Sequence, residues 1–258
     1  MNKIFLVFCL VYFFLFSFSI CAETKPVPVR YSYFGNFSAL ELVPEEAQNA
    51  PVVIYLYDEF YDRFGRGRST QQGYDPFSFL RTFEEWGFIS IMPNKPARKL
   101  NGIKAAIRYA QKHPQADPGS IFIVGCSEAS FLSLFTGPLL NQTHGLILIN
   151  PKSIHDTGYL SFPGFRRVVS QIKVPVLHLV STEIKKVDIH TGRTIYKGLK
   201  DFGISVDYQE YPVNHRWFWT PKKTFMGRIK TFIDEKLGVE DVIEKEKKSI
   251  YSTTETTS

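Results

Sequence analysis

From about residue 51 onward, short apolar runs alternate with segments that repeat apolar residues at helical spacing. Most of the runs are continuous in Val, Ile and Leu, which is typical of parallel strands buried on both faces. The strand-like runs are PVVIYLY, FISIM, SIFIVG, GLILIN, VPVLHLV and SVDYQEY. Helices are expected at 77–86, at 101–113, from Ser127, at roughly 190–202 and from Lys222 to Leu237. This alternation predicts an α/β fold, with a mostly parallel central sheet and helices on both faces.

One domain is expected between residues 23 and 238. Upstream of the alternation, RYSYFGNFSALELV predicts one or two antiparallel edge strands. Residues 239–258 become charged and then rich in Ser and Thr, which predicts a disordered tail.

Residues 1–22 read as a signal peptide, with one Lys, an apolar run from Ile4 and a small residue at Ala22. The run is long enough for a retained membrane anchor, but its cleavable end favours export with removal. A lipoprotein cysteine at Cys21 is disfavoured because Ile20 stands where such signals carry a small residue. We therefore expect a secreted or periplasmic protein, in contact with a membrane only through an uncleaved leader.

Cysteine content and charge argue against a disulfide-stabilised protein and against a nucleic-acid-binding protein. Cys9 and Cys21 lie in the leader, so Cys126 remains alone and forms no internal disulfide. The formal charge of +6 comes from scattered basic residues without a nucleic-acid recognition motif. We expect a solvated basic surface and no nucleic-acid partner.

The stretch IFIVGCSEASF predicts the catalytic nucleophile. Gly125, Ser127 and Ala129 follow the G-x-S-x-G spacing, with Ala in the last place, between an apolar strand and an apolar helix. Such a turn needs small residues on each side of the apex, and it presents the apical Oγ at a helix N-terminus, where negative charge is favoured. Ser127 is therefore the predicted nucleophile and Cys126 a buried packing residue. An ordinary strand-to-helix turn is the alternative.

A serine nucleophile needs a histidine base and an acid that orients it. His215 follows the last predicted strand, where the carboxyl ends of the strands gather, and is the expected base. The acid is expected after VPVLHLV, which favours Glu183 and leaves Asp188 as the alternative. For each carboxylate the other interpretation is an ordinary solvated side chain.

The oxyanion that forms in acyl transfer needs two N–H donors. The backbone of Glu128 is one candidate, and the loop YLYDEFYDRFGRG offers the backbone of Glu59 or Phe60 as the other. Aromatic residues near these segments, Trp217 among them, suggest an apolar acyl pocket, although core packing explains many of them equally well.

Residues 50 to 235 resemble the dienelactone hydrolase branch of the α/β-hydrolases. The resemblance lies in PVVIYLYDEF, in NGIKAAIRYAQKHPQADPGSIFIVGCSEASFLSL and in YPVNHRWFW. It implies that Ser127 is the nucleophile and His215 the base, with Phe60 and Glu128 as oxyanion donors and Glu59 beside the nucleophile. This chain has Ser where the enzymes that cleave dienelactone carry Cys. Asp58 stands where the family's loop carries His, and Glu183 is about one residue off register.

These features predict a serine hydrolase that cleaves an ester, lactone or related acyl bond of a small molecule. No metal or other cofactor is expected, because the triad supplies nucleophile, base and charge stabilisation. The alternatives are a catalytically degenerate binding protein on the same scaffold and an acyltransferase that uses the same serine.

Overall fold

A computed structural model of the chain describes residues 25–31, 35–94, 100–151, 162–183 and 186–239. The predicted leader, 1–22, and nearly all of the predicted tail, 239–258, lie outside these residues. Within the described ranges no helix combines the length and apolar character needed to cross a membrane.

Eight strands form one sheet in the order β1-β2-β4-β3-β5-β6-β7-β8. β1 pairs with β2, and β2 with β4, in antiparallel fashion, and every other neighbouring pair is parallel. The predicted mostly parallel sheet with antiparallel edge strands is confirmed. The strands are β1 (Val27–Tyr31), β2 (Phe37–Leu42), β3 (Ala50–Leu56), β4 (Ile89–Pro93), β5 (Ala116–Cys126), β6 (Gly145–Ile149), β7 (Val176–Ser181) and β8 (Val206–Tyr211).

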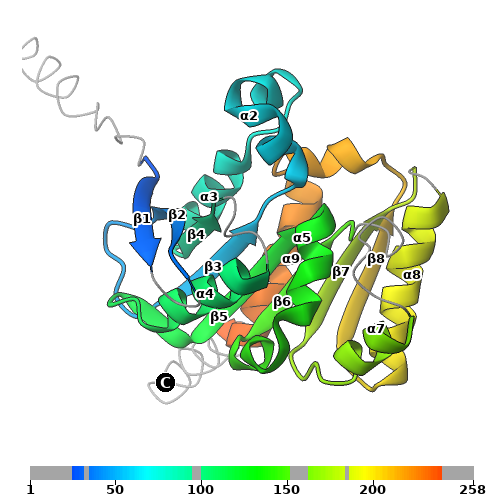
Figure 1. Cartoon of the computed structure of the whole chain (residues 1–258). Coiled ribbons are helices and arrows are strands. Elements are labelled where there is room, and N and C mark those ends of the chain that lie inside the picture. The colour runs from blue at the N-terminus through cyan, green and yellow to red at the C-terminus, as the bar shows by residue number, and fades with distance from the viewer. Residues whose placement is uncertain (1–24, 32–34, 95–99, 152–161, 184–185, 240–258) are drawn as a thin grey trace, which may run out of the picture.

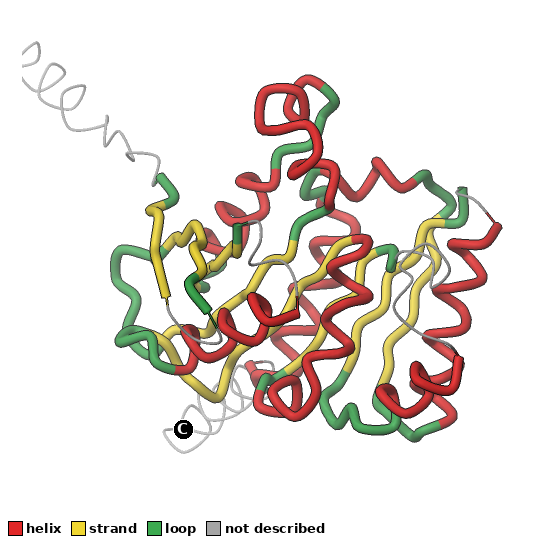
Figure 2. Tube along the Cα trace, in the orientation of Figure 1, coloured by secondary structure: helices red, strands yellow, loops and turns green. Residues whose placement is uncertain are grey.

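Helices cover both faces of the sheet, as Figures 1 and 2 show. The residues of α4, α5, α7 and α8 pack into one buried cluster, and those of α3 and α9 into another on the opposite face. The helical segments are α2 (Glu59–Gln71), α3 (Pro76–Glu85), α4 (Leu100–Gln111), α5 (Ser127–Ser133), η1 (Leu134–Gln142), α7 (Phe162–Val169), α8 (Lys186–Asp201), η2 (His215–Trp219) and α9 (Lys223–Leu237).

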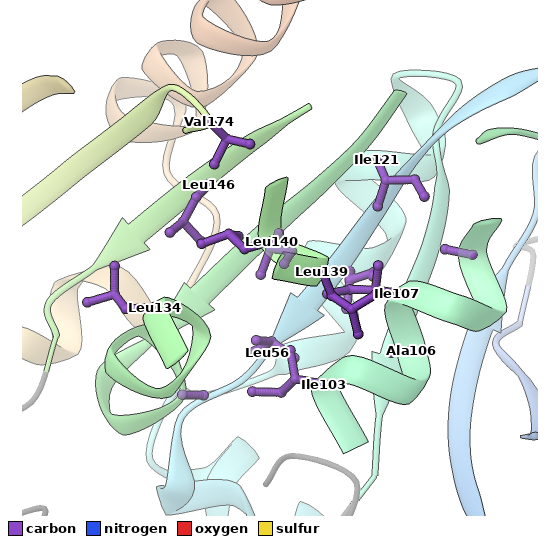
Figure 3. Close-up of a cluster of buried hydrophobic side chains, with 14 of the residues drawn as sticks. Leu56, Ile103, Ala106, Ile107, Ile121, Leu134, Leu139, Leu140, Leu146 and Val174 are labelled. Atoms are coloured by element: carbon purple, nitrogen blue, oxygen red, sulfur yellow. The ribbon is translucent and has the colours of Figure 1, made fainter. Parts of the chain in front are cut away.

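The first cluster explains why α4 lies where it does. Ile103, Ala106 and Ile107 share one face of α4, and all three are fully buried against sheet residues such as Leu56 and Ile121 (Figure 3). Burying such side chains contributes about 1.5–3 kcal/mol for each large aliphatic residue. The helical spacing read from the sequence therefore marks the buried face of α4.

α2 is the main element that periodicity did not predict. Its sequence, EFYDRFGRGRSTQ, contains two glycines and several charges, so it lacks an apolar stripe. Gly65 has a φ of 72° and breaks the helix into two parts. The first part begins because the side chain of Asp58 accepts the backbone N–H of Phe60 and so caps the helix. Figure 1 shows α2 at the end of the sheet where the orange segment after β8 also lies.

His178, on β7, is a buried imidazole without polar support. It is fully buried, neither ring nitrogen has a hydrogen-bond partner among the described residues, and its ring meets Tyr208 edge-on at 5.2 Å. Burial lowers the pKa of His178 to about 3, because the charged form is poorly solvated there. The residue is therefore neutral in the folded protein at neutral pH.

We predict that His178 makes the fold sensitive to acid. Between its ordinary pKa of about 6.5 and the folded value of about 3, the unfolded chain binds one more proton at this residue. Its contribution to the free energy of unfolding therefore falls by about 1.4 kcal/mol per pH unit as the pH drops through that window. The free energy of unfolding, measured with urea at several pH values, should fall less steeply with decreasing pH in His178→Phe than in the wild type. The exposed control His190→Gln should keep the wild-type pH dependence. If His178→Phe keeps the wild-type pH dependence of the free energy of unfolding, His178 is not the source of the acid sensitivity.

Candidate functional site

Ser127 occupies a strained turn between β5 and α5. Its φ is 55°, a left-handed conformation that non-glycine residues rarely adopt and that costs on the order of 1–3 kcal/mol. A Cβ on Gly125 would lie 2.6 Å from Ser130 Cα, so only glycine fits there, and Ala129 is fully buried. The strand, tight turn and helix expected around the predicted nucleophile are present.

Cys126 is excluded as an active thiol by its surroundings. It is buried, and its Sγ lies 3.8 Å from the hydroxyl of Tyr55. Burial raises the pKa of the Cys126 thiol to about 12, with the negative charge of Asp58 adding to the effect. The thiolate, which is the reactive form, is therefore negligible at neutral pH.

The pairing of β3 with β5 brings Asp58 beside Ser127. Leu56 lies opposite Gly125 in the parallel ladder. Asp58 and Ser127 each follow two residues later, at the carboxyl ends of adjacent strands.

The pairing of β5 with β6 brings Asn150 to the other side of Ser127. Cys126 lies opposite Ile149, so Ser127 and Asn150 are the next residues of the two strands. Asn150 also has a left-handed φ, of 45°. Ser127 is thus flanked by Asp58 and Asn150.

The imidazole of His215 bridges these two flanking side chains. His215 begins η2, after β8; its Nε2 lies 2.6 Å from Asp58 Oδ2 and its Nδ1 lies 3.2 Å from Asn150 Nδ2. β3 and β6 are separated by two strand spacings, about 10 Å, which an imidazole with a partner at each nitrogen can span. The ring therefore lies across the end of β5, which Ser127 directly follows. Its side chain is 32% exposed.

Asp58 is a buried carboxylate whose charge is well supported. Its side chain is 6% exposed, Oδ2 faces His215, and Oδ1 accepts the backbone N–H of Phe60 at 2.8 Å. Burial alone would raise the pKa of the Asp58 carboxyl, but the hydrogen bond and positive charge of His215 and the Phe60 N–H outweigh it and lower the pKa. The backbone N–H of Asp58 donates to the hydroxyl of Tyr74 at 2.7 Å. The carboxylate is ionised at neutral pH.

Asn150 was missed by the sequence reasoning. Its Oδ1 accepts the backbone N–H of Ser181 at 2.6 Å and the hydroxyl of the same residue at 3.0 Å. The only signal in the sequence is a polar residue directly after the apolar run GLILI. That position becomes informative once β6 is known to neighbour β5.

Glu183, the acid favoured by the sequence, is not hydrogen-bonded to the imidazole among the described residues. It is exposed at the end of β7. Asp188 lies inside α8, and its side chain is outside the described part of the chain. The carboxylate that contacts His215 is Asp58, at the place where the family's loop carries His.

Of the predicted oxyanion donors, the Phe60 N–H already has a hydrogen-bond partner within the protein. The Phe60 N–H is bound by Asp58 Oδ1, so a substrate oxygen would have to displace the carboxylate to reach it. Glu128 directly follows Ser127 in the first turn of α5, and the role of its backbone N–H stays a prediction. Glu59 begins α2 and pairs with Arg63.

An aromatic cluster surrounds the Asp58 side of the site. The ring of Trp219 lies 4.7 Å from that of Phe60, 5.3 Å from Tyr74 and 6.3 Å from His215, measured between centroids. Trp217, the predicted substrate residue, is half-buried and packs against the core, with its ring 5.3 Å from that of Phe225. Trp219 is therefore the tryptophan that lies beside the imidazole.

Across residues 25–239, apart from the stretches that are not described, no group of three or more His, Cys, Asp or Glu side chains is placed to hold a metal ion. At the carboxyl ends of the strands the structure brings together the hydroxyl of Ser127, the imidazole of His215, the carboxylate of Asp58 and the amide of Asn150. Such a set of groups is suited to proton transfer.

We predict that Gly125→Ala destabilises the fold, because the new Cβ would overlap the backbone at Ser130. Overpacking of this kind costs about 1–3 kcal/mol. Gly227→Ala on α9 is the matched control, since its Cβ would meet nothing within 4 Å and alanine favours a helix by about 0.5–1 kcal/mol. Thermal unfolding should lower the Tm of the first variant and preserve or raise that of the second. Equal Tm values would contradict the tight turn.

Comparison with known proteins identifies the fold. No family model and no curated protein matches the chain. Among solved structures it is similar to an esterase of Rhizomucor miehei, with a TM-score of 0.63, 16% identity and 84% of each chain covered. A protein from Klebsiella pneumoniae assigned as a dienelactone hydrolase gives a TM-score of 0.53 and 15% identity, over 73% of this chain and 86% of that one.

The Pyrococcus horikoshii acylaminoacyl peptidase gives a TM-score of 0.57 and 17% identity over 83% of this chain. The chain spans only 42% of the length of that peptidase. At these identities the likeness shows the fold alone, and the family resemblance read from the sequence is confirmed at that level. The chain has the α/β-hydrolase fold.

Proposed function

We propose that this protein is a serine hydrolase that cleaves an ester, lactone or related acyl bond. The observation that carries the proposal is the position of Ser127, in a strained turn between the two side chains that hold the imidazole of His215. A left-handed serine that costs free energy persists where its surroundings enforce it, and such residues cluster at active sites.

In the proposed reaction His215 removes the proton of Ser127 as Oγ attacks the acyl carbon. Asp58 takes the place of the triad acid: its buried carboxylate orients the ring and stabilises the imidazolium that forms. An ion pair of this kind is strong because Asp58 is shielded from water. The substrate's acyl–oxygen bond then breaks as His215 gives its proton to the leaving oxygen, and water releases the acyl group from Ser127 as the acid.

The oxyanion would be stabilised by the backbone N–H of Glu128 and by a second donor. The Phe60 N–H is bound by Asp58, so it can serve only if the carboxylate moves. The amide of Asn150 is the better candidate for the second donor. Its Nδ2 carries two hydrogens, and only one of them can be directed at His215.

The substrate we propose is a small acyl compound with an apolar or aromatic portion. Support comes from the aromatic cluster of Phe60, Tyr74 and Trp219 beside the imidazole. Export through the segment 1–22 remains part of the proposal, so the protein would meet its substrate outside the cell or in the periplasm.

A non-catalytic protein on the same scaffold is the second candidate, and one observation favours it. Both ring nitrogens of His215 are bound to side chains other than Ser127, and the carboxylate of Asp58 occupies a predicted oxyanion donor. In that case the hydrogen-bonded residues stabilise the sheet edge, and the chain does not turn over an ester.

A fluorophosphonate probe distinguishes the two candidates. We expect covalent labelling of the purified protein at Ser127, read by mass spectrometry of the labelled peptide, and no labelling of Ser127→Ala. Cys126→Ala is the matched control and should label like the wild type, because its thiol is buried and protonated. An unlabelled but folded wild-type protein would favour the non-catalytic candidate.

The same probe tests which carboxylate acts with His215. Asp58→Asn should slow labelling by roughly 10²-fold or more, since it removes the charge that stabilises the imidazolium. Glu183→Gln should label at close to the wild-type rate. The opposite pattern, with Glu183→Gln slow and Asp58→Asn fast, would restore the acid expected from the sequence.

A further inference from the structure

The two side chains that flank His215 are each anchored by a backbone N–H. Phe60 N–H donates to Asp58 Oδ1 at 2.8 Å, and Ser181 N–H donates to Asn150 Oδ1 at 2.6 Å. A backbone N–H can only donate, so the side-chain atom that meets it must be an oxygen. The Asn150 atom that faces Ser181 is therefore the oxygen, and the atom that faces His215 is the nitrogen. In most side-chain amides these two atoms are hard to tell apart.

This anchoring determines what each side chain presents to the ring. Asn150 has used its oxygen on Ser181, so Nδ2, a donor, faces His215 Nδ1 at 3.2 Å. Asp58 presents its second oxygen, an acceptor, to Nε2 at 2.6 Å. A neutral imidazole has one donor and one acceptor nitrogen. The only tautomer that satisfies both contacts carries its proton on Nε2 and a lone pair on Nδ1.

We propose that Asn150 is a positioning residue that fixes the tautomer of His215, so that Nδ1, and not Nε2, takes the proton of Ser127. In the common Ser-His-Asp arrangement the acid binds Nδ1–H and Nε2 is the base. Here the carboxylate of Asp58 lies on the Nε2 side, which reverses the two roles.

The reversed ring supports a balanced proton transfer. The Ser127 proton moves to the Nδ1 lone pair while Oγ bonds to the acyl carbon, and the same proton later passes to the leaving-group oxygen as the acyl–oxygen bond breaks. The single lone pair of Nδ1 accepts from Asn150 Nδ2–H in the resting state, so this contact must open before Nδ1 takes the Ser127 proton. The step rests on the proposed function, whereas the resting tautomer does not.

The tautomer can be measured directly in the wild-type protein. ¹⁵N NMR of protein labelled at histidine, above pH 8, separates protonated from unprotonated ring nitrogens, and His215→Gln identifies the signals of this residue. We expect Nε2 to be protonated and Nδ1 to be unprotonated. A proton on Nδ1 of His215, or a mixture of both tautomers, would overturn the proposal.

An exchange of the two flanking side chains provides a sharper test. In the double variant Asp58→Asn with Asn150→Asp, each anchored oxygen stays on its backbone N–H, but the donor and the acceptor change sides. The proton should move to Nδ1. Ser181→Ala is the control: it removes the hydroxyl bond to Asn150 but keeps the backbone N–H, so the wild-type tautomer should persist. A folded double variant with its proton still on Nε2 would contradict the proposal.

Probe labelling of the same proteins separates this inference from the proposed function. Asn150→Asp alone places a carboxylate at each ring nitrogen, so both should be protonated and labelling of Ser127 should slow by roughly 10²-fold or more. If Ser127 does not label in any form but the ring has the expected tautomer, the hydrolase proposal fails and the positioning role stands. If Ser127 labels but the tautomer is the other one, the positioning role fails alone.

Discussion

The candidate site depends on one interaction, the pair of hydrogen bonds that hold the His215 ring between Asp58 and Asn150. Each partner is itself tied to the backbone, Asp58 through Phe60 and Asn150 through Ser181. The ring is therefore held by residues at the ends of β3, β6 and β7, in addition to η2, which carries it. Ser127 directly follows β5, the strand between β3 and β6, so the same contacts hold the imidazole at the strand end from which Ser127 emerges.

Asp58 connects this site to the α2 segment. An isolated buried carboxylate would be costly, by several kcal/mol, and it is tolerated here because both oxygens are hydrogen-bonded. The bond to Phe60 also caps α2, where a negative charge interacts favourably with the helix N-terminus. A movement of α2 would therefore disturb the partner of His215. This cap, together with the packing of Phe60 and Tyr61 against the core, holds a segment with two glycines at the carboxyl ends of the strands.

Much of the fold could be predicted because burial leaves a strong pattern. The continuous apolar runs gave the parallel strands, the helical spacing of Ile103, Ala106 and Ile107 gave the buried face of α4, and the small residues around Ser127 gave the tight turn. α2 could not be predicted, since its start depends on a cap from Asp58 and its path on Gly65, and neither produces an apolar period.

The partners of His215 were beyond local patterns for a different reason. Asp58 precedes His215 by 157 residues, and the two meet where the parallel strands from β3 to β8 have their carboxyl ends. Sequence reasoning placed the acid at Glu183 because that residue follows the strand β7, which was the expected location. The resemblance did single out Asp58, where the family's loop carries His, but only as a departure from the pattern.

The most direct test of this account is a crystal structure of the protein after reaction with a phosphonate ester. The account predicts phosphorus bonded to Ser127 Oγ, with the His215 ring still bound to Asp58 through Nε2 and with Nδ1 directed at the adduct. An adduct on another residue, or a ring that has turned away from Asp58 toward Glu183, would contradict it.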